Sequence, residues 1–247
     1  MKAVILAAGV ASRLKPLTEN TPKCLLKIGE KNILQRTIDN LIQNNIDDII
    51  IVTGFLQEQI VNFIDTNYPE LKVEYLYNEK YDSTNNIYSL WMTKDLVLND
   101  DMLLMDSDIL FDHKIIDLLI NSGHENCLAI RSDHVLSEEE IKVTVDENRA
   151  INKINKTVDQ KIAIGESIGI EKFSSEYLQT LFDILDDKIL NRGEVNQWYE
   201  AAFEESIESG SKIYAVDVNR LKCMELDTVE DIESARKNIV FDLDSQL

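Results

Sequence analysis

The stretch KAVILAAGVASRL, residues 2–14, decides the fold of this chain. Its first five residues form an apolar, β-branched run typical of a buried strand, and Ala7, Ala8 and Gly9 end that run. A strand that enters a small-residue loop before a helix presents successive backbone N–H groups, which can hold a phosphate. Arg13 adds local positive charge. The stretch therefore predicts the first strand of an α/β sheet followed by a phosphate-binding loop, with a tight turn bearing a solvated cation as the alternative.

The same alternation of strand and helix continues through the first 110 residues. Apolar runs predict strands, and apolar residues at helical spacing predict the helices between them. In chain order the segments are helix 33–42, strand 48–53, helix 56–64, strand 72–77, helix 87–94 and strand 101–105. This pattern indicates a parallel sheet with helices on both faces.

The pattern changes after about residue 112, where strands follow one another with few helices between them. Strands are expected at 127–130, 141–146, 150–156, 163–171, 212–216 and 223–226, and helices at 174–185, 195–203 and from Thr228 to about residue 238. We therefore expect one α/β domain over residues 1–247. It is Rossmann-like, with a mixed, mostly parallel central sheet flanked by helices and a smaller antiparallel subregion in its second half.

Composition excludes some classes of partner. The 247 residues carry 25 Lys and Arg against 45 Asp and Glu, a formal net charge of −20, which disfavours binding to nucleic acid or an anionic membrane surface. No run of about eighteen apolar residues is present, so we expect a cytoplasmic protein without membrane insertion. Cys24, Cys127 and Cys223 are odd in number and widely spaced, which is typical of structural thiols in a reducing compartment. The oligomeric state stays open, a homo-oligomer included.

Two acidic pairs follow predicted strands. Asp106 and Asp108 lie at the end of one, on the same side by strand periodicity, and Glu225 and Asp227 end another with the same spacing. A hard cation such as Mg²⁺ takes one or two such carboxylates together with water and phosphate oxygens. In a chain with 45 acidic residues one such pair is expected by chance, so the pairs by themselves leave the metal site undecided.

The longer motif LAAGVASRLKPLT at 6–18, with Thr21-Pro22-Lys23, resembles the signature of the nucleotidyltransferases that make nucleotide-activated sugars and alcohols. The usual pattern is LAAG-x-G-[ST]-R-L-x-P-L-T followed by PK, and Ala11 stands where Gly is commoner. The spacing fits neither the dinucleotide fingerprint G-x-G-x-x-G nor the P-loop.

This resemblance implies roles for individual residues. The loop would wrap a nucleoside triphosphate through Leu6, Ala7, Ala8, Gly9, Ala11 and Ser12. Arg13 and Lys23 would contact its phosphates and serve as the catalytic cations. Asp108 and Asp227 match the family's Mg²⁺ ligands, which leaves Asp106 beside the nucleotide and Glu225 in a supporting role. The implied reaction is in-line attack of an acceptor phosphate on the α-phosphorus, with release of pyrophosphate.

A second stretch, YDSTNNIYSLW at 81–91, resembles the branch that uses CTP, which includes phosphocholine and 2-aminoethylphosphonate cytidylyltransferases. Thr84, Asn85 and Asn86 offer hydroxyl and amide groups at a helix start for reading a base edge. Helix capping by Thr84 or Asn85 is the alternative.

Two segments of the second half resemble acceptor-binding strands of that family. Lys156 in INK would meet the acceptor phosphate, and Glu166 in GESIGI would face its head group, unless it is only an edge carboxylate. Aromatic side chains could hold a cationic head group. Those of interest are Tyr81, Tyr88, Trp91, Trp198 and Tyr199. The resemblance thus assigns nucleotide binding to residues 1–111 and acceptor binding to residues 112–247.

We therefore expect a Mg²⁺- and CTP-dependent cytidylyltransferase that acts on a small phosphorylated or phosphonylated alcohol or amine. Phosphocholine is favoured, with phosphoethanolamine or 2-aminoethylphosphonate next. A sugar-1-phosphate or polyol-phosphate nucleotidyltransferase is one alternative. A noncatalytic nucleotide-binding regulatory subunit is another, although such a subunit would be expected to lose Lys23 or the metal carboxylates, and all are present.

Overall fold

A computed structural model describes residues 1–238 of the chain. The N-terminal half of the main sheet is parallel, as the sequence predicts. Strand β1 (Lys2–Ala7) lies between β4 (Asp48–Thr53) and β6 (Met102–Asp106) and is parallel to both, and β5 (Lys72–Tyr77) adds in parallel to β4. The carboxyl ends of these strands meet at one edge of the sheet, where α/β proteins place their sites.

The second half extends the same sheet with antiparallel strands. The long strand β11 (Gly165–Phe173) pairs antiparallel with β6, and so joins the two halves. Along the edge that carries β6 it also pairs antiparallel with β9, and along its other edge it pairs antiparallel with β8. The remaining members are β8 (Cys127–Arg131), β9 (Lys142–Val145), β10 (Ile151–Asn155) and β12 (Tyr214–Asp217). The expected mixed, mostly parallel sheet with an antiparallel subregion is confirmed.

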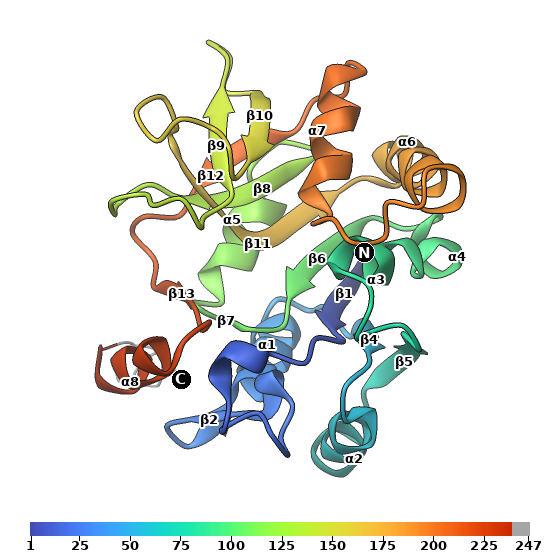
Figure 1. Ribbon diagram of the computed structural model, residues 1–247, viewed down its shortest axis with the longest axis vertical. Coiled ribbons are helices and arrows are strands. Elements are labelled where there is room, and N and C mark those ends of the chain that lie inside the picture. The colour runs from blue at the N-terminus through green and yellow to red at the C-terminus, as the bar shows by residue number, and fades with distance from the viewer. Residues whose placement is uncertain (239–247) are drawn as a thin grey trace.

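Helices cover both faces of the sheet (Figure 1). Alternate residues of β1 point to opposite faces: Ile5 enters one buried apolar cluster and Val4 the other. The Ile5 side is covered by α1 (Ile33–Gln43), α2 (Gln57–Asn67) and α5 (Lys114–Ile120). The Val4 side is covered by α3 (Asn86–Trp91), α4 (Lys94–Val97), α6 (Ser175–Asp186) and α7 (Glu200–Glu208).

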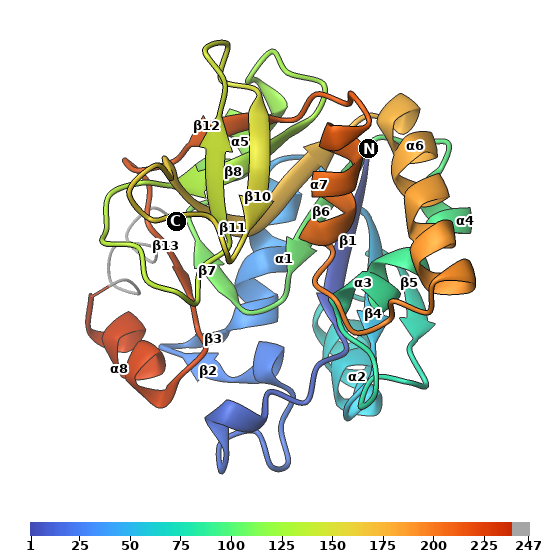
Figure 2. The ribbon, with the colours of Figure 1, turned by 45° about the horizontal axis from the view of Figure 1, so that its top comes forward.

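The C-terminal segment returns to the first loop. Strand β13 (Cys223–Glu225) pairs antiparallel with the short β7 (Ile109–Phe111), and α8 (Val229–Asn238) follows. Helix α8 packs near the two-residue strands β2 (Lys27–Ile28) and β3 (Lys31–Asn32), as Figure 2 shows. The predicted start of the last helix is present, because the Asp231 carboxylate accepts from Thr228 N at 2.7 Å and Asp231 N donates to Thr228 Oγ1.

Some local predictions are wrong. Helix α7 begins at Glu200 rather than near 195, because tertiary hydrogen bonds hold the preceding segment as a loop: Val195 O accepts from Asn85 N. The expected helix 87–94 is divided into α3 and α4, and α5 was not predicted. The three cysteines are free and buried, as expected of structural thiols. Within residues 1–238 no helix combines the length and apolarity needed to cross a membrane.

Candidate active site

The side chains at the end of β1 and the start of the first loop are buried. Leu6, Ala7 and Ala8 are buried, so only their backbone can face a ligand. Gly9 is exposed, and a Cβ built on it would meet nothing within 4 Å; the protein itself does not require glycine there. Close approach of a ligand is the remaining reason for a residue without a side chain.

Ala11 adopts a left-handed backbone, with φ 49° and ψ 51°, just before the 3₁₀ turn Ser12–Leu14. Its carbonyl accepts from Thr18 Oγ1 at 2.8 Å, which fixes the loop. A left-handed conformation costs an alanine roughly 1–2 kcal/mol. The family's usual glycine at this position therefore reflects the backbone conformation as well as the need for a small side chain.

Lys23 is the centre of the site. Its Nζ lies 2.7 Å from Asp108 Oδ2 and 2.7 Å from Asp227 Oδ1, while Arg13 contacts the other oxygen of Asp227 at 2.8 Å. Burial by itself lowers the pKa of Lys23, but the two carboxylates raise it well above its usual range. Lys23 is therefore a permanent cation at this edge of the sheet.

Strand pairing brings these residues together. Ile109 lies opposite Glu225 in the β7–β13 pair, and Leu226 N donates to Asp108 O at 3.0 Å. Asp108 and Asp227, which are far apart in sequence, consequently flank one point. Burial raises the pKa of Asp227, yet Lys23, then Arg13 and Lys156, lower it below its usual value.

The acidic residues fit a hard divalent cation. One carboxylate oxygen each from Asp108, Glu225 and Asp227 lies within 4.8 Å of the others. Asp108 Oδ1 is buried and has no hydrogen-bond partner among the described residues. An oxygen-only donor set with a free buried oxygen is what Mg²⁺ binds in proteins. Asp108 and Asp227 would hold the ion, which would draw phosphate oxygens together and offset their charge.

Strand periodicity predicts that Asp106 and Asp108 point to the same side, but Asp106 does not contact Lys23, the partner of Asp108. Strand β6 ends at Asp106, so the period of two does not extend to Asp108. Asp106 Oδ2 instead accepts from Tyr199 Oη at 2.9 Å, and Gly169, with φ +71°, leaves room for it: a Cβ there would lie 2.7 Å from that oxygen. Burial, then Asp108 and Glu200, raise the pKa of Asp106 well above its usual value.

The 84–86 stretch has structural hydrogen bonds of its own. Asn85 Oδ1 caps α3 by accepting from Asn86 N at 2.7 Å, as the capping alternative anticipates. Asn86 Oδ1 accepts from Tyr199 N at 3.0 Å, and Thr84 Oγ1 donates to Lys80 O at 2.8 Å. These bonds shape the start of α3, and base reading by its free polar atoms stays a prediction.

Glu166, which the sequence assigns to acceptor binding, is not an isolated carboxylate. Arg131 Nη2 contacts its Oε1 at 3.0 Å, and Arg131 Nε donates to His134 Nδ1 at 3.2 Å. His134 Nε2 lies 3.4 Å from Glu166 Oε1 and has no hydrogen-bond partner among the described residues. Burial raises the pKa of Glu166, opposed by Arg131. No sequence motif pointed to Arg131 or His134.

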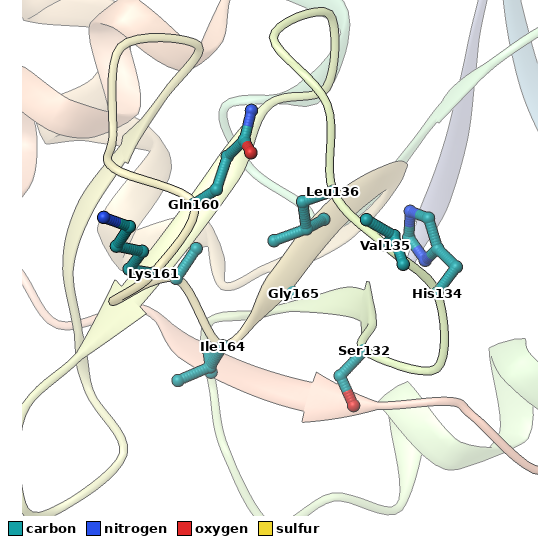
Figure 3. A pocket seen from close by; sticks show the side chains of 9 residues that line it. Ser132, His134, Val135, Leu136, Gln160, Lys161, Ile164 and Gly165 are labelled. Carbon is teal, nitrogen blue, oxygen red and sulfur yellow. The ribbon is translucent and has the colours of Figure 1, made fainter.

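A pocket of about 310 Å³ opens beside Glu166 (Figure 3). The loop after β8 lines one side of it and the segment before β11 lines the other, with Gly165 at its base. Val135 is 93% exposed on that loop. The lining mixes polar and apolar residues, namely Ser132, His134, Val135, Leu136, Gln160, Lys161, Ala163, Ile164 and Gly165.

The aromatic residues separate into two groups. Tyr81 lies 6.4 Å from Phe55, ring centre to ring centre, and Tyr88 lies 5.2 Å from Trp91, whose Nε1 donates to Asp186. These contacts belong to the elements around α3. Trp198, in contrast, lies under the Lys156 ammonium, with Nζ 4.4 Å from its ring centre.

Comparison with known proteins identifies the class. The nucleotidyl transferase family pattern matches residues 2–131, just over half of the chain. The chain belongs to this family, and the expectation of a nucleotidyltransferase enzyme is confirmed.

Individual relatives share this class. The CTP:phosphoglutamine cytidylyltransferase of Campylobacter jejuni is 28% identical over 94% of this chain and 98% of its own length. The choline-phosphate cytidylyltransferase of Streptococcus pneumoniae is 41% identical, over 44% of each chain. Two solved structures share the fold: a CTP:phosphocholine cytidylyltransferase from S. pneumoniae (TM-score 0.77, 24% identity, 96% and 97% of the two chains) and an inositol-1-phosphate CTP transferase from T. maritima (0.78, 18%, 97% of each).

Proposed function

We propose that the protein is a CTP-dependent cytidylyltransferase that transfers CMP to a small phosphorylated or phosphonylated alcohol or amine. The observation that carries the proposal is the Lys23 ammonium held between Asp108 and Asp227, directly beside the exposed first loop. The relatives named as cytidylyltransferases support CTP as the nucleotide.

In this proposal residues 1–111 bind CTP and residues 112–247 bind the acceptor. The last nine residues of the second half lie outside the described part of the chain. The backbone of the first loop and Arg13 hold the triphosphate, and Thr84, Asn85 and Asn86 lie by the base.

The chemistry requires alignment and charge balance. An acceptor phosphate oxygen attacks the α-phosphorus of CTP, the bond from that phosphorus to the bridging oxygen breaks, and pyrophosphate leaves with the electron pair. Lys23 stabilises the charge that develops around the α-phosphate, because it is fixed and permanently cationic. Lys156 receives the acceptor phosphate, so that two repelling phosphates are held in line.

Phosphocholine is the favoured acceptor, with phosphoethanolamine and 2-aminoethylphosphonate next. Glu200 and Glu225 are largely buried, and burial raises their pKa values to about 7 and about 8, so near neutral pH they are only partly ionised and supply little charge to a head group. A cationic head group would gain from ionised carboxylates and from free aromatic faces. Because Arg131 already neutralises Glu166, that carboxylate contributes less than its sequence motif suggested.

A pyrophosphate-release assay with four nucleotides against a panel of acceptors tests the proposal. CTP should be the best nucleotide. A cationic acceptor should exceed any hexose 1-phosphate at least tenfold in kcat/KM, roughly 1.4 kcal/mol, and added salt should narrow that margin. A sugar or polyol phosphate as best acceptor would support the alternative enzyme and remove the cationic-pocket argument. Absence of turnover with CTP and every acceptor of the panel would refute the proposal.

A further inference from the structure

The aromatic ring of Trp198 lies at the surface and is not part of the hydrophobic core. The side chain is 47% exposed and lies outside the buried apolar clusters. The backbone around it is held by other groups: Tyr199 N donates to Asn86 Oδ1 at 3.0 Å, and Ala201 N donates to Trp198 O at 3.1 Å. Tyr199 itself is fully buried. The segment is therefore fixed whether or not the indole is present.

The ring is occupied by one cation. Lys156 Nζ lies 4.4 Å from the ring centre, well within the range of a cation–π contact. The backbone of Lys156 is also anchored, because the preceding Asn155 accepts from Thr157 N through Oδ1 at 2.8 Å. The four-carbon stem of a lysine has many rotamers, so a fixed aromatic face restricts where its ammonium lies.

The Lys156 ammonium also contacts a carboxylate, that of Glu139. Glu139 Oε2 lies 3.5 Å from Lys156 Nζ, although the Glu139 side chain is 81% exposed. Neighbouring contacts hold its loop in shape: Glu140 Oε2 accepts from Ser137 N at 2.7 Å, and the buried Lys142 Nζ donates to Ser137 O. An exposed ion pair at this distance is weak, so a dianionic phosphate can replace Glu139.

We propose that Trp198 is a positioning residue: its indole holds the Lys156 ammonium in place, where the ammonium exchanges Glu139 for the phosphate of the acceptor. The proposal rests on the proposed function in one respect, the assignment of Lys156 to the acceptor phosphate.

A double-mutant cycle tests the pair, with phosphocholine as acceptor and pyrophosphate release as the readout. Trp198→Leu should raise the KM for phosphocholine about three- to fivefold, as expected from a partly exposed cation–π contact, and leave kcat and the KM for CTP nearly unchanged. Trp198→Phe should restore most of the loss. In a Lys156→Met background, Trp198→Leu should add nothing. Leu190→Ala, which removes another exposed apolar side chain (63%), is the matched control and should change neither constant.

The outcomes separate this proposal from the proposed function. If Lys156→Met leaves the KM for phosphocholine unchanged, the acceptor-phosphate assignment fails and the proposal with it. If Lys156→Met raises that KM but the Trp198→Leu effect multiplies with it, only the positioning role is overturned.

Fluorescence gives a readout that needs no turnover. The chain has two tryptophans, so Trp91→Phe leaves Trp198 as the only emitter. In that variant, inorganic phosphate should change the emission of Trp198 by replacing the Glu139 carboxylate at the Lys156 ammonium that lies over the ring. The additional substitution Lys156→Met should itself shift the emission and abolish the response to phosphate. Identical emission with and without Lys156, or no response to phosphate, would overturn the proposal.

Discussion

Replacing Lys23 with methionine should expose the competition between an ammonium and a metal for the same carboxylates. Lys23 Nζ contacts Asp108 and Asp227 at 2.7 Å each, and its side chain is only 11% exposed. Each hydrogen bond to a charged group is worth about 1.5–3 kcal/mol, and Arg13 still neutralises Asp227 in the variant. We therefore expect Lys23→Met to lose about 2 kcal/mol of unfolding free energy without metal, which is about 4–8 °C in Tm for a chain of this size.

Added Mg²⁺ should stabilise the variant more than the natural chain. In the natural protein the ion must share its carboxylates with the ammonium, whereas in Lys23→Met it meets them uncompensated. A tenfold gain in affinity at saturating metal adds about 1.4 kcal/mol of stabilisation. Thermal unfolding across a Mg²⁺ titration measures both effects, and Lys27→Met, at the exposed residue of strand β2, is the matched control.

The catalytic activity of Lys23→Met should fall, although its stabilisation by Mg²⁺ should increase. Because Lys23 is placed to stabilise developing charge, kcat should fall about 10²–10³-fold and by a larger factor than the KM for CTP rises. A Mg²⁺-induced Tm shift no larger in Lys23→Met than in the natural chain would refute the shared-carboxylate argument. An unchanged kcat with only a raised KM would mean that Lys23 binds the nucleotide and does not assist its reaction.

Three further predictions follow from single side chains. Asp108→Asn should lower kcat by about two orders of magnitude with the fold retained by circular dichroism, and Glu225→Gln should cost less; near-normal turnover of Asp108→Asn at limiting Mg²⁺ would contradict the metal assignment. Gly9→Ala should leave Tm within a degree or two, since its Cβ meets no atom within 4 Å, yet raise the KM for CTP about tenfold; an unchanged KM would mean that no ligand approaches there. Burial raises the pKa of Glu200 from 4.5 to about 7, so its stabilising contribution is complete below pH 4.5 and is lost as pH rises through 7. As pH rises from 4.5 to 8, the unfolding free energy of Glu200→Gln should accordingly increase by about 3 kcal/mol relative to that of the natural chain, measured by denaturant titration. The control variant Glu208→Gln, at an exposed position, should show no such gain. Equal pH profiles of the Glu200→Gln variant and the natural chain would refute the burial argument.

Features that depend on neighbours in the sequence were predictable from it. The period of apolar residues located β1, β4, β5 and β6 to within a residue or two, because strand and helix each impose their own spacing on buried side chains. The first loop was equally visible, since its function needs small residues at consecutive positions. Even there, the positive φ of Ala11 was hidden, because it depends on the bond from Thr18 to its carbonyl.

Hydrogen bonds between distant segments decided the rest. The sequence supplied Asp106, Asp108 and Asp227 as candidates, but the register of β13 against β7 brought Asp227 to Asp108. Because β6 ends at Asp106, that carboxylate accepts a hydrogen bond from Tyr199 and does not follow the direction of Asp108.

The acceptor side shows the same division most clearly. The sequence motifs there predicted roles for Lys156 and Glu166. The partners of those two residues, Trp198 and Arg131, come from segments that no local sequence pattern links to them. The amino-acid sequence thus determined the sheet, the first loop and the chemical groups available, because local periodicity and side-chain chemistry depend on adjacent residues. Only the tertiary structure decided which groups neutralise one another, because strand register and long-range hydrogen bonds set the distances on which charge interactions depend.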